Sequence, residues 1–185
     1  MAKMIPQDIT HLSVNTTQGE KALYRIIQRR TPDDWVCYAG QRLGTGTTPD
    51  FLLIGPDLGV LILEEKSVPI NLIKKLTTES WTVIRDGSPR VETHPLRQAR
   101  GYVEKTMRAL QKIKRLTDSS GKLKFVFGHG AILSNIRKGE MILSDIEKFS
   151  TPPMATFEPH LVICKNELPS NRQKESDFTK RLKQM

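Results

Sequence analysis

Two stretches of the chain carry apolar residues at the spacing of an amphipathic helix. A capping-box pattern from Thr17 to Glu20 marks the start of the first helix, which is predicted from Thr16 to Arg30 with apolar positions at Ala22, Leu23, Ile26 and Ile27. Pro95 suits the first position of the second, longer helix. That helix is predicted to run to Leu116, with an apolar stripe formed by Leu96, Ala99, Val103, Met107, Leu110 and Ile113.

Short apolar runs separated by turn residues predict strands. The runs Asp50–Ile54 and Gly59–Lys66 flank the turn sequence GPDLG and predict a hairpin. A helix, a run of strands, a helix and more strands predict an α/β fold with a mixed sheet. The final segment, 169–185, is polar and is expected to be a linker or a solvated helix outside the core. Further strands are predicted at Val36–Leu43, Leu72–Leu76, Trp81–Arg85, Phe125–Phe127, Ala131–Leu133 and His160–Cys164.

The predicted hairpin brings charged residues to one end of two apolar strands. With the turn centred on Asp57, Asp50 is expected to face Glu64. Directly opposed Cβ atoms lie about 5 Å apart, so two like charges there require a cation. Side chains alternate along a strand, which places Lys66 on the face of Glu64 and Glu65 on the other face.

Two carboxylates and an ammonium at one end of a hairpin suit phosphodiester chemistry. Mg²⁺ is commonly held by one or two carboxylates together with water and phosphate oxygens. We therefore expect Asp50 and Glu64 to hold Mg²⁺, for which Mn²⁺ would substitute, and Lys66 to orient or help deprotonate the attacking water. A salt-bridged sheet edge is the alternative, and a register slip of one residue would exchange Glu64 for Glu65.

Charge and composition limit the chemical class of the binding partner. The net charge of +9 and the pI of about 9.7 favour an anionic partner, either nucleic acid or an anionic membrane surface. No apolar run approaches the roughly 18–20 residues of a membrane span, and two distant cysteines make no disulfide framework. We expect a soluble, cytoplasmic protein. Six cations of the long helix lie away from its apolar stripe and form either a track for DNA phosphates or an ordinary solvated face: Arg97, Arg100, Lys105, Arg108, Lys112 and Arg115.

The order of motifs along residues 1–168 resembles the NERD family, the nuclease-related domain. The segments MAKMIP and FGHGAILSNI resemble the versions of this domain found in front of DNA helicases. The resemblance to the PD-(D/E)xK nuclease signature and to this family is carried by Gly19-Glu20 at a helix start, Pro49-Asp50, Glu64-Glu65-Lys66, Trp81 in the next strand region, and HPLRQA, His94 to Ala99, at the start of the long helix.

This resemblance implies a restriction-endonuclease-like core, a central mixed β-sheet flanked by helices, and Mg²⁺-dependent cleavage of DNA. By motif position, Asp50 and Glu64 would hold the metal, Lys66 would assist the water, and Glu20 and Gln98 would be auxiliary site residues. From the residues alone, Glu20 is equally a helix cap and Gln98 an ordinary polar residue.

Two other functions fit the same motifs. An archaeal-type Holliday junction resolvase would act as a homodimer on four-way DNA. A catalytically silent DNA-binding module would target a helicase, in the same or another chain.

Overall fold

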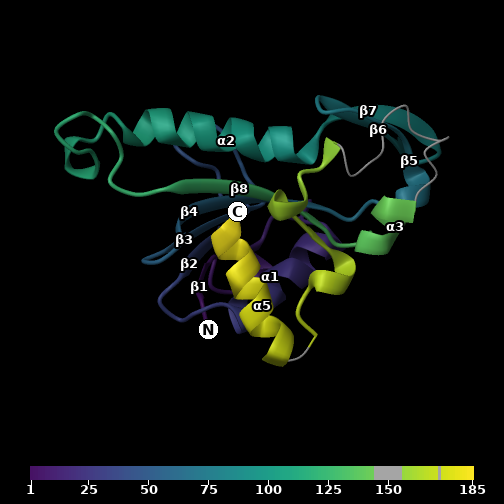
Figure 1. The fold of residues 1–185 in the computed structure, drawn as a ribbon, viewed down its shortest axis with the longest axis horizontal. Helices are drawn as coiled ribbons and strands as arrows, with labels where there is room; N and C mark the ends of the chain where they lie inside the picture. The colour runs from purple at the N-terminus through teal and green to yellow at the C-terminus, as the bar shows by residue number, and fades with distance from the viewer. Residues whose placement is uncertain (144–155, 171) are drawn as a thin grey trace.

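A six-stranded sheet forms the centre of the fold (Figure 1). The computed structural model describes residues 1–143, 156–170 and 172–185, so residues 144–155 of the predicted domain lie outside the described residues. The strands lie in the order β1-β2-β3-β4-β8-β9. Their bounds are β1 Lys3–Ile5, β2 Val36–Ala39, β3 Phe51–Gly55, β4 Gly59–Lys66, β8 Phe127–Leu133 and β9 Val162–Cys164.

The central sheet is mixed, as predicted. Strands β2, β3 and β4 form an antiparallel meander, whereas β1 runs parallel to β2, and β8 runs parallel to both β4 and β9. Helices pack on both of its faces, so the predicted α/β fold with a central mixed sheet is confirmed.

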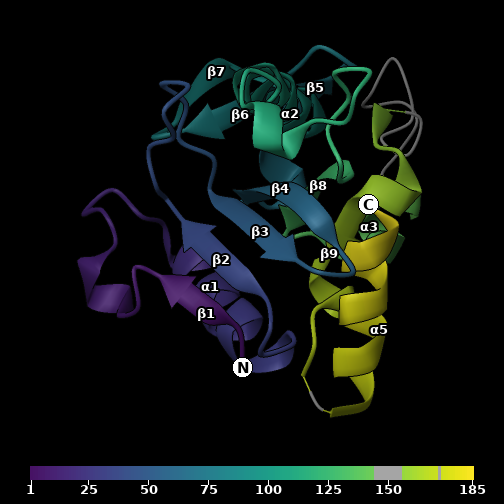
Figure 2. The same cartoon turned by 90° about the vertical axis from the view of Figure 1, so that its left-hand side faces the viewer.

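The three helices that cover the sheet divide between its two faces (Figures 1 and 2). They are α1 Gln18–Arg30, α2 Pro95–Leu110 and α5 Arg172–Gln184. Alternation along the strands separates the two cores. Leu52 and Ile62 pack with Val103 of α2, while neighbouring strand residues such as Leu53 and Leu63 pack with the residues of α1 and α5.

A second, three-stranded antiparallel sheet lies beside the N-terminal end of α2. It consists of β5 Ile73–Leu76, β6 Ser80–Arg85 and β7 Ser88–Thr93. Asp86 and Gly87 both have positive φ, which suits the two-residue turn between β6 and β7. Strand β7 was not predicted because its side chains are almost all exposed, so no apolar alternation marks it.

Several predicted boundaries differ from the structure. Strand β2 ends at Ala39, before Gly40 with its positive φ, and α2 ends at Leu110. Lys112 and Arg115 therefore lie outside the long helix. The two strands predicted between residues 125 and 133 are the single strand β8. Within the described ranges, the short remaining elements are α3 Lys138–Leu143 and five 3₁₀ turns at Ile9–His11, Ile70–Leu72, Lys114–Leu116, Pro159–Leu161 and Lys165–Glu167.

The expectation that the final segment lies outside the core is wrong. Its helix, α5, buries Phe178 and Leu182 completely among the core residues of α1 and the sheet. The Thr179 hydroxyl also donates a hydrogen bond to the Arg30 carbonyl oxygen, at 3.3 Å. Two apolar residues four apart are enough to dock one face of a helix, although the other positions make its sequence look like a solvated tail.

Candidate active site

The hairpin of β3 and β4 has the register that the sequence predicts. Ile54 pairs with Val60, Leu52 with Ile62, and the last pair is Phe51 with Leu63. Asp50 directly precedes β3, and Glu64 is the next residue along β4. The two carboxylates therefore lie at the same end of the hairpin.

Four side chains predicted for the site meet on the face of the sheet that α2 covers. The Lys66 ammonium donates to Glu64 Oε1 at 2.8 Å, and the Gln98 amide donates to the same oxygen. Asp50 Oδ2 accepts the backbone N–H of Glu65 at 2.7 Å. Glu64 is almost completely buried. The structure thus brings Gln98 from α2 to the acids of the hairpin.

Tyr102 is a member of this group that the sequence did not predict. Its hydroxyl accepts a hydrogen bond from Gln98 Nε2 at 3.1 Å. Burial raises the pKa of Tyr102, so the phenol stays protonated at neutral pH. Its spacing of four residues from Gln98 places both on one edge of α2 and is the signal that could have indicated it.

Glu65 points to the opposite face of the sheet, toward α1. The Ser134 hydroxyl donates to its Oε1, and the Thr17 hydroxyl lies 3.4 Å from its Oε2. A Cβ on Gly19 would collide with this carboxylate. The first turn of α1 therefore approaches Glu65 so closely that a side chain at position 19 would force this carboxylate away from Ser134 and Thr17.

Glu20 caps α1, which was one of the two roles considered for it. Its carboxylate accepts the Thr17 backbone N–H at 3.0 Å, and the Thr17 hydroxyl accepts the Glu20 N–H at 3.1 Å. Its negative charge nevertheless contributes to raising the pKa of Asp50. The helix cap therefore lies close enough to the acids to influence their ionisation without a direct contact to Glu64.

The pKa values of both carboxyl groups at the site, Asp50 and Glu64, are raised. Burial and the neighbouring Glu64 carboxylate raise the pKa of Asp50 to about 8. Burial also raises the pKa of Glu64, against the opposing effect of Lys66. For Lys66, burial lowers the pKa, but the carboxylates outweigh it and the net shift is upward. Negative charge is thus costly at this site unless a cation joins it.

The site residues fit a divalent cation. Glu64 Oε2 is buried, and among the described residues no hydrogen-bond donor contacts it while Asp50 is ionised; a proton on Asp50 would bridge the two carboxyl groups. A buried carboxylate oxygen without a partner is unfavourable, and a cation held between it and Asp50 would satisfy it. No group of three or more potential His, Cys, Asp or Glu ligands occurs among the described residues, but Mg²⁺ requires only one or two carboxylates.

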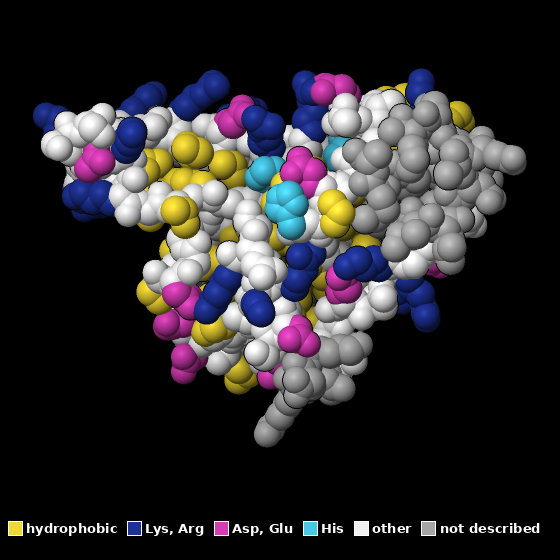
Figure 3. All heavy atoms as spheres, in the orientation of Figure 1, with side chains coloured by type: hydrophobic (Ala, Val, Ile, Leu, Met, Phe, Trp, Pro, Cys, Tyr) yellow, Lys and Arg dark blue, Asp and Glu magenta, His cyan; other side chains and the backbone are white. Residues whose placement is uncertain are grey.

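The six cations expected to contact DNA fall into two groups. Arg97 forms an ion pair with Glu79, and Arg100 lies 3.4 Å from Glu104. These two arginines form the first, paired group. Figure 3 shows Lys and Arg side chains that project outward along α2, above a group of hydrophobic side chains. The other four are exposed and form no ion pair within the described residues: Lys105, Arg108, Lys112 and Arg115.

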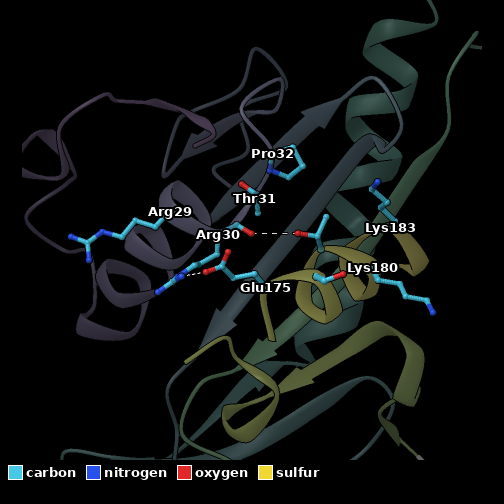
Figure 4. A pocket seen from close by; sticks show the side chains of 9 residues that line it. Arg29, Arg30, Thr31, Pro32, Glu175, Lys180 and Lys183 are labelled. Atoms are coloured by element: carbon cyan, nitrogen blue, oxygen red, sulfur yellow. Dashed lines mark hydrogen bonds and ion pairs between the residues drawn. The ribbon is translucent and has the colours of Figure 1, made fainter. Parts of the chain in front are cut away.

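A cavity of about 490 Å³ lies between α5 and the C-terminal end of α1, at the other end of α1 from Gly19. Arg30 is paired with Glu175, and Lys183 with Asp57. Arg29 and Lys180 point away from each other (Figure 4). Because its cations do not converge, we assign no chemistry to this cavity.

Comparison with known families agrees with this arrangement. No match was found among curated proteins or among solved structures. None of the helices within the described residues is long and apolar enough to cross a membrane. The model of the nuclease-related domain, NERD, matches residues 16–132, a range that contains α1, the hairpin and α2. The chain therefore belongs to the NERD family of nuclease-related domains.

Proposed function

We propose that this nuclease-related domain is a metal-dependent deoxyribonuclease that hydrolyses DNA phosphodiester bonds. The observation that carries the proposal is the unsatisfied, buried Oε2 of Glu64 beside Asp50, with Lys66 on the same face. If these residues formed only a salt-bridged sheet edge, each buried carboxylate oxygen would be expected to have a hydrogen-bond partner within the protein. DNA repair, recombination or processing in the cytoplasm, beside a helicase, is the setting we propose.

In this proposal Asp50 and Glu64 hold Mg²⁺, or Mn²⁺ in its place. The cation supplies Lewis-acid polarisation of the phosphate and a lower pKa for the attacking water. The backbone N–H of Glu65 fixes Asp50, and the Gln98 amide, oriented by Tyr102, fixes Glu64. Both carboxylates are thereby held in place before substrate arrives, which reduces the reorganisation needed in the transition state.

Lys66 supplies the positive charge of the protein at this site. Its ammonium lies on Glu64 Oε1 and keeps its proton, because the carboxylates raise its pKa. When phosphate binds, this ammonium is placed to orient the attacking water and to stabilise negative charge developing on the phosphate. The four unpaired cations on and after α2 would hold the phosphates on either side of the scissile bond.

A cleavage assay on single-stranded, duplex and four-way DNA, with Mg²⁺, Mn²⁺ or EDTA, tests the proposal. We expect cleavage with either metal, none in EDTA, and loss of cleavage in Lys66→Ala but not in the control Lys75→Ala, which removes an exposed lysine of β5. DNA binding without cleavage under every metal would replace the proposal with a silent binding module. A strong preference for four-way DNA, together with a dimer in solution, would favour a junction resolvase.

A further inference from the structure

An apolar groove runs beside α2, at the end of the helix distant from Gln98. Its volume is about 330 Å³. Ile54 and Ile113, on its two walls, remain 40% and 37% exposed. The side chains that give the groove its apolar character are Tyr38, Leu52, Ile54, Val60, Leu110 and Ile113.

This groove lies on the same strip of the fold as the acid site. Val60, Ile62 and Glu64 alternate along one face of β4, so Val60 in the groove lies about 13 Å from Glu64 at the strand rise of roughly 3.3 Å. On the helix, Thr106 of the groove is one turn from Tyr102, which bonds Gln98. A strand of nucleic acid with its phosphate at Glu64 therefore reaches the groove within a few nucleotides.

Three cations lie close in sequence to residues that line the groove. Arg42 precedes Leu43 and Gly44 on the wall formed by the segment between β2 and β3, which Figure 2 shows to the left of α2. On the other wall, Lys105 lies about one helical turn before Ala109 of α2, and Lys112 directly precedes Ile113. All three are exposed and form no ion pair with any residue that the structure describes.

We propose that this groove binds an unpaired nucleobase of single-stranded DNA, while Arg42, Lys105 and Lys112 hold the adjacent phosphates. An aromatic or apolar surface in a basic channel is how proteins bind single strands, because every base has an apolar face. The outside of a duplex offers phosphates but no free base faces. The proposal rests on the proposed nuclease function and names its substrate class.

The charge around the groove favours DNA over a protein partner. Lysine is depleted at protein–protein interfaces, since burying an unpaired ammonium is unfavourable. A second copy of this chain would bring further positive charge, because its net charge is +9. A polyanion instead neutralises all three cations while its bases cover the apolar walls.

DNA binding measured by fluorescence anisotropy in Ca²⁺ tests the proposal with a single strand and a duplex of equal length. The variant is Ile54→Thr combined with Ile113→Ser, and the matched control is Val91→Thr, an exposed aliphatic residue on β7. We expect the double variant to bind the single strand about fivefold or more weakly, the low end of a lost base contact, and the duplex as wild type does. The control should bind both as wild type does.

Equal weakening toward single strand and duplex, or no change toward either, would overturn the proposal. So would a dimer that the double variant converts to monomer while single-strand affinity stays the same, since the groove would then join two copies. Thermal unfolding of each variant checks that the fold is intact. A single strand carrying one photoreactive iododeoxyuridine should also cross-link to Tyr38, and a cross-link confined to residues outside the groove would contradict the assignment.

These outcomes are distinct from failure of the nuclease proposal. Loss of single-strand affinity in the double variant, with no cleavage by wild type, would retain the base site and reject hydrolysis. Cleavage by wild type with no effect of the double variant would retain hydrolysis and reject the base site.

Discussion

Glu64 and Glu65 are neighbours on β4, and both are almost completely buried, but they lie in opposite environments. Glu64 points toward α2, where Lys66 and Gln98 both contact one of its oxygens and leave the other without a partner. Glu65 points toward α1, where hydroxyl groups from Thr17 and Ser134 approach one oxygen each.

The difference lies in how completely each carboxylate is satisfied. The hydrogen bonds of Glu65 join the start of α1 to the end of β8, so this acid has a structural environment. Glu64 has one oxygen that no donor contacts among the described residues, at the end of the hairpin where Asp50 lies just before β3. Burial alone therefore does not distinguish a structural acid from a candidate metal ligand, whereas a count of the partners of each oxygen does.

The largest expected effect compares Lys66→Ala with Glu65→Gln in a Mg²⁺ cleavage assay. Lys66 is proposed to act in the transition state, so its removal should lower turnover by about 10²–10⁴-fold and leave DNA affinity in Ca²⁺ nearly unchanged. Glu65→Gln keeps the size of the side chain on the other face and should be much milder. If Glu65→Gln abolishes cleavage and Lys66→Ala does not, the roles assigned to the two faces are reversed.

The second prediction concerns metal binding. A ligand that binds only the folded state at 100 times its Kd stabilises it by about 2.7 kcal/mol. Saturating Mn²⁺ should therefore raise the melting temperature of wild type and of Glu65→Gln, but not of Asp50→Ala. Differential scanning fluorimetry measures this, and equal shifts in all three proteins would remove Asp50 from the site.

The third prediction is that the stability of the protein, with and without Mn²⁺, depends on pH through the ionisation of Asp50. Its pKa in the folded protein is about 8, above the ordinary value of 3.8. Between pH 3.8 and about pH 8 the Asp50 carboxyl group is therefore protonated in the folded protein and ionised in the unfolded chain. The metal-free protein should therefore lose stability as pH rises through this window, and Asp50→Asn should reduce the loss. Because Mn²⁺ must displace the proton, its stabilising effect should grow from about pH 6 to about pH 8.5. A Mn²⁺ effect that weakens as pH rises would contradict this ionisation.

The hairpin could be predicted from sequence because local patterns determine it. The turn residues and strand alternation were enough to give the register and to place Glu64 and Glu65 on different faces. The helix cap at Thr17 and Glu20 was also visible, since its two partners are three residues apart. In both features the interacting residues are close together in the sequence.

Contacts distant in sequence were not accessible in the same way. The Ser134 contact to Glu65 joins residues 69 apart, and nothing in the local pattern marks Ser134. The ion pair of Arg97 with Glu79 joins two exposed side chains, one on α2 and one in the turn between β5 and β6. The docking of α5 depends on Phe178 and Leu182 in an otherwise polar segment, so sequence periodicity gave it little weight.

The fourth prediction tests the structural side of the comparison through two glycines. Gly19→Ala forces a Cβ against the Glu65 carboxylate and should destabilise the protein by about 1–3 kcal/mol. Gly101→Ala, inside α2 with open space around it, should stabilise the protein by about 0.5–1 kcal/mol. Chemical denaturation measures both. If Gly19→Ala is as stable as wild type, the tight packing of α1 on Glu65 is wrong.

The smallest expected effect asks which face of the sheet meets DNA, using two pairs of exposed cations. Arg108 and Lys112 lie on and just after α2, on the side of Glu64, whereas Arg29 and Lys180 lie on α1 and α5, on the side of Glu65. Each phosphate contact contributes about 0.9 to the slope of log affinity against log salt for duplex DNA. Replacing Arg108 and Lys112 with alanine should therefore reduce the slope by roughly two and weaken binding to all sequences alike. Replacing Arg29 and Lys180 with alanine removes the same charge and should leave the slope unchanged. Equal reductions in both variants would mean that net charge, rather than the face beneath α2, determines binding, and a larger reduction in the second variant would move the DNA to the α1 and α5 side.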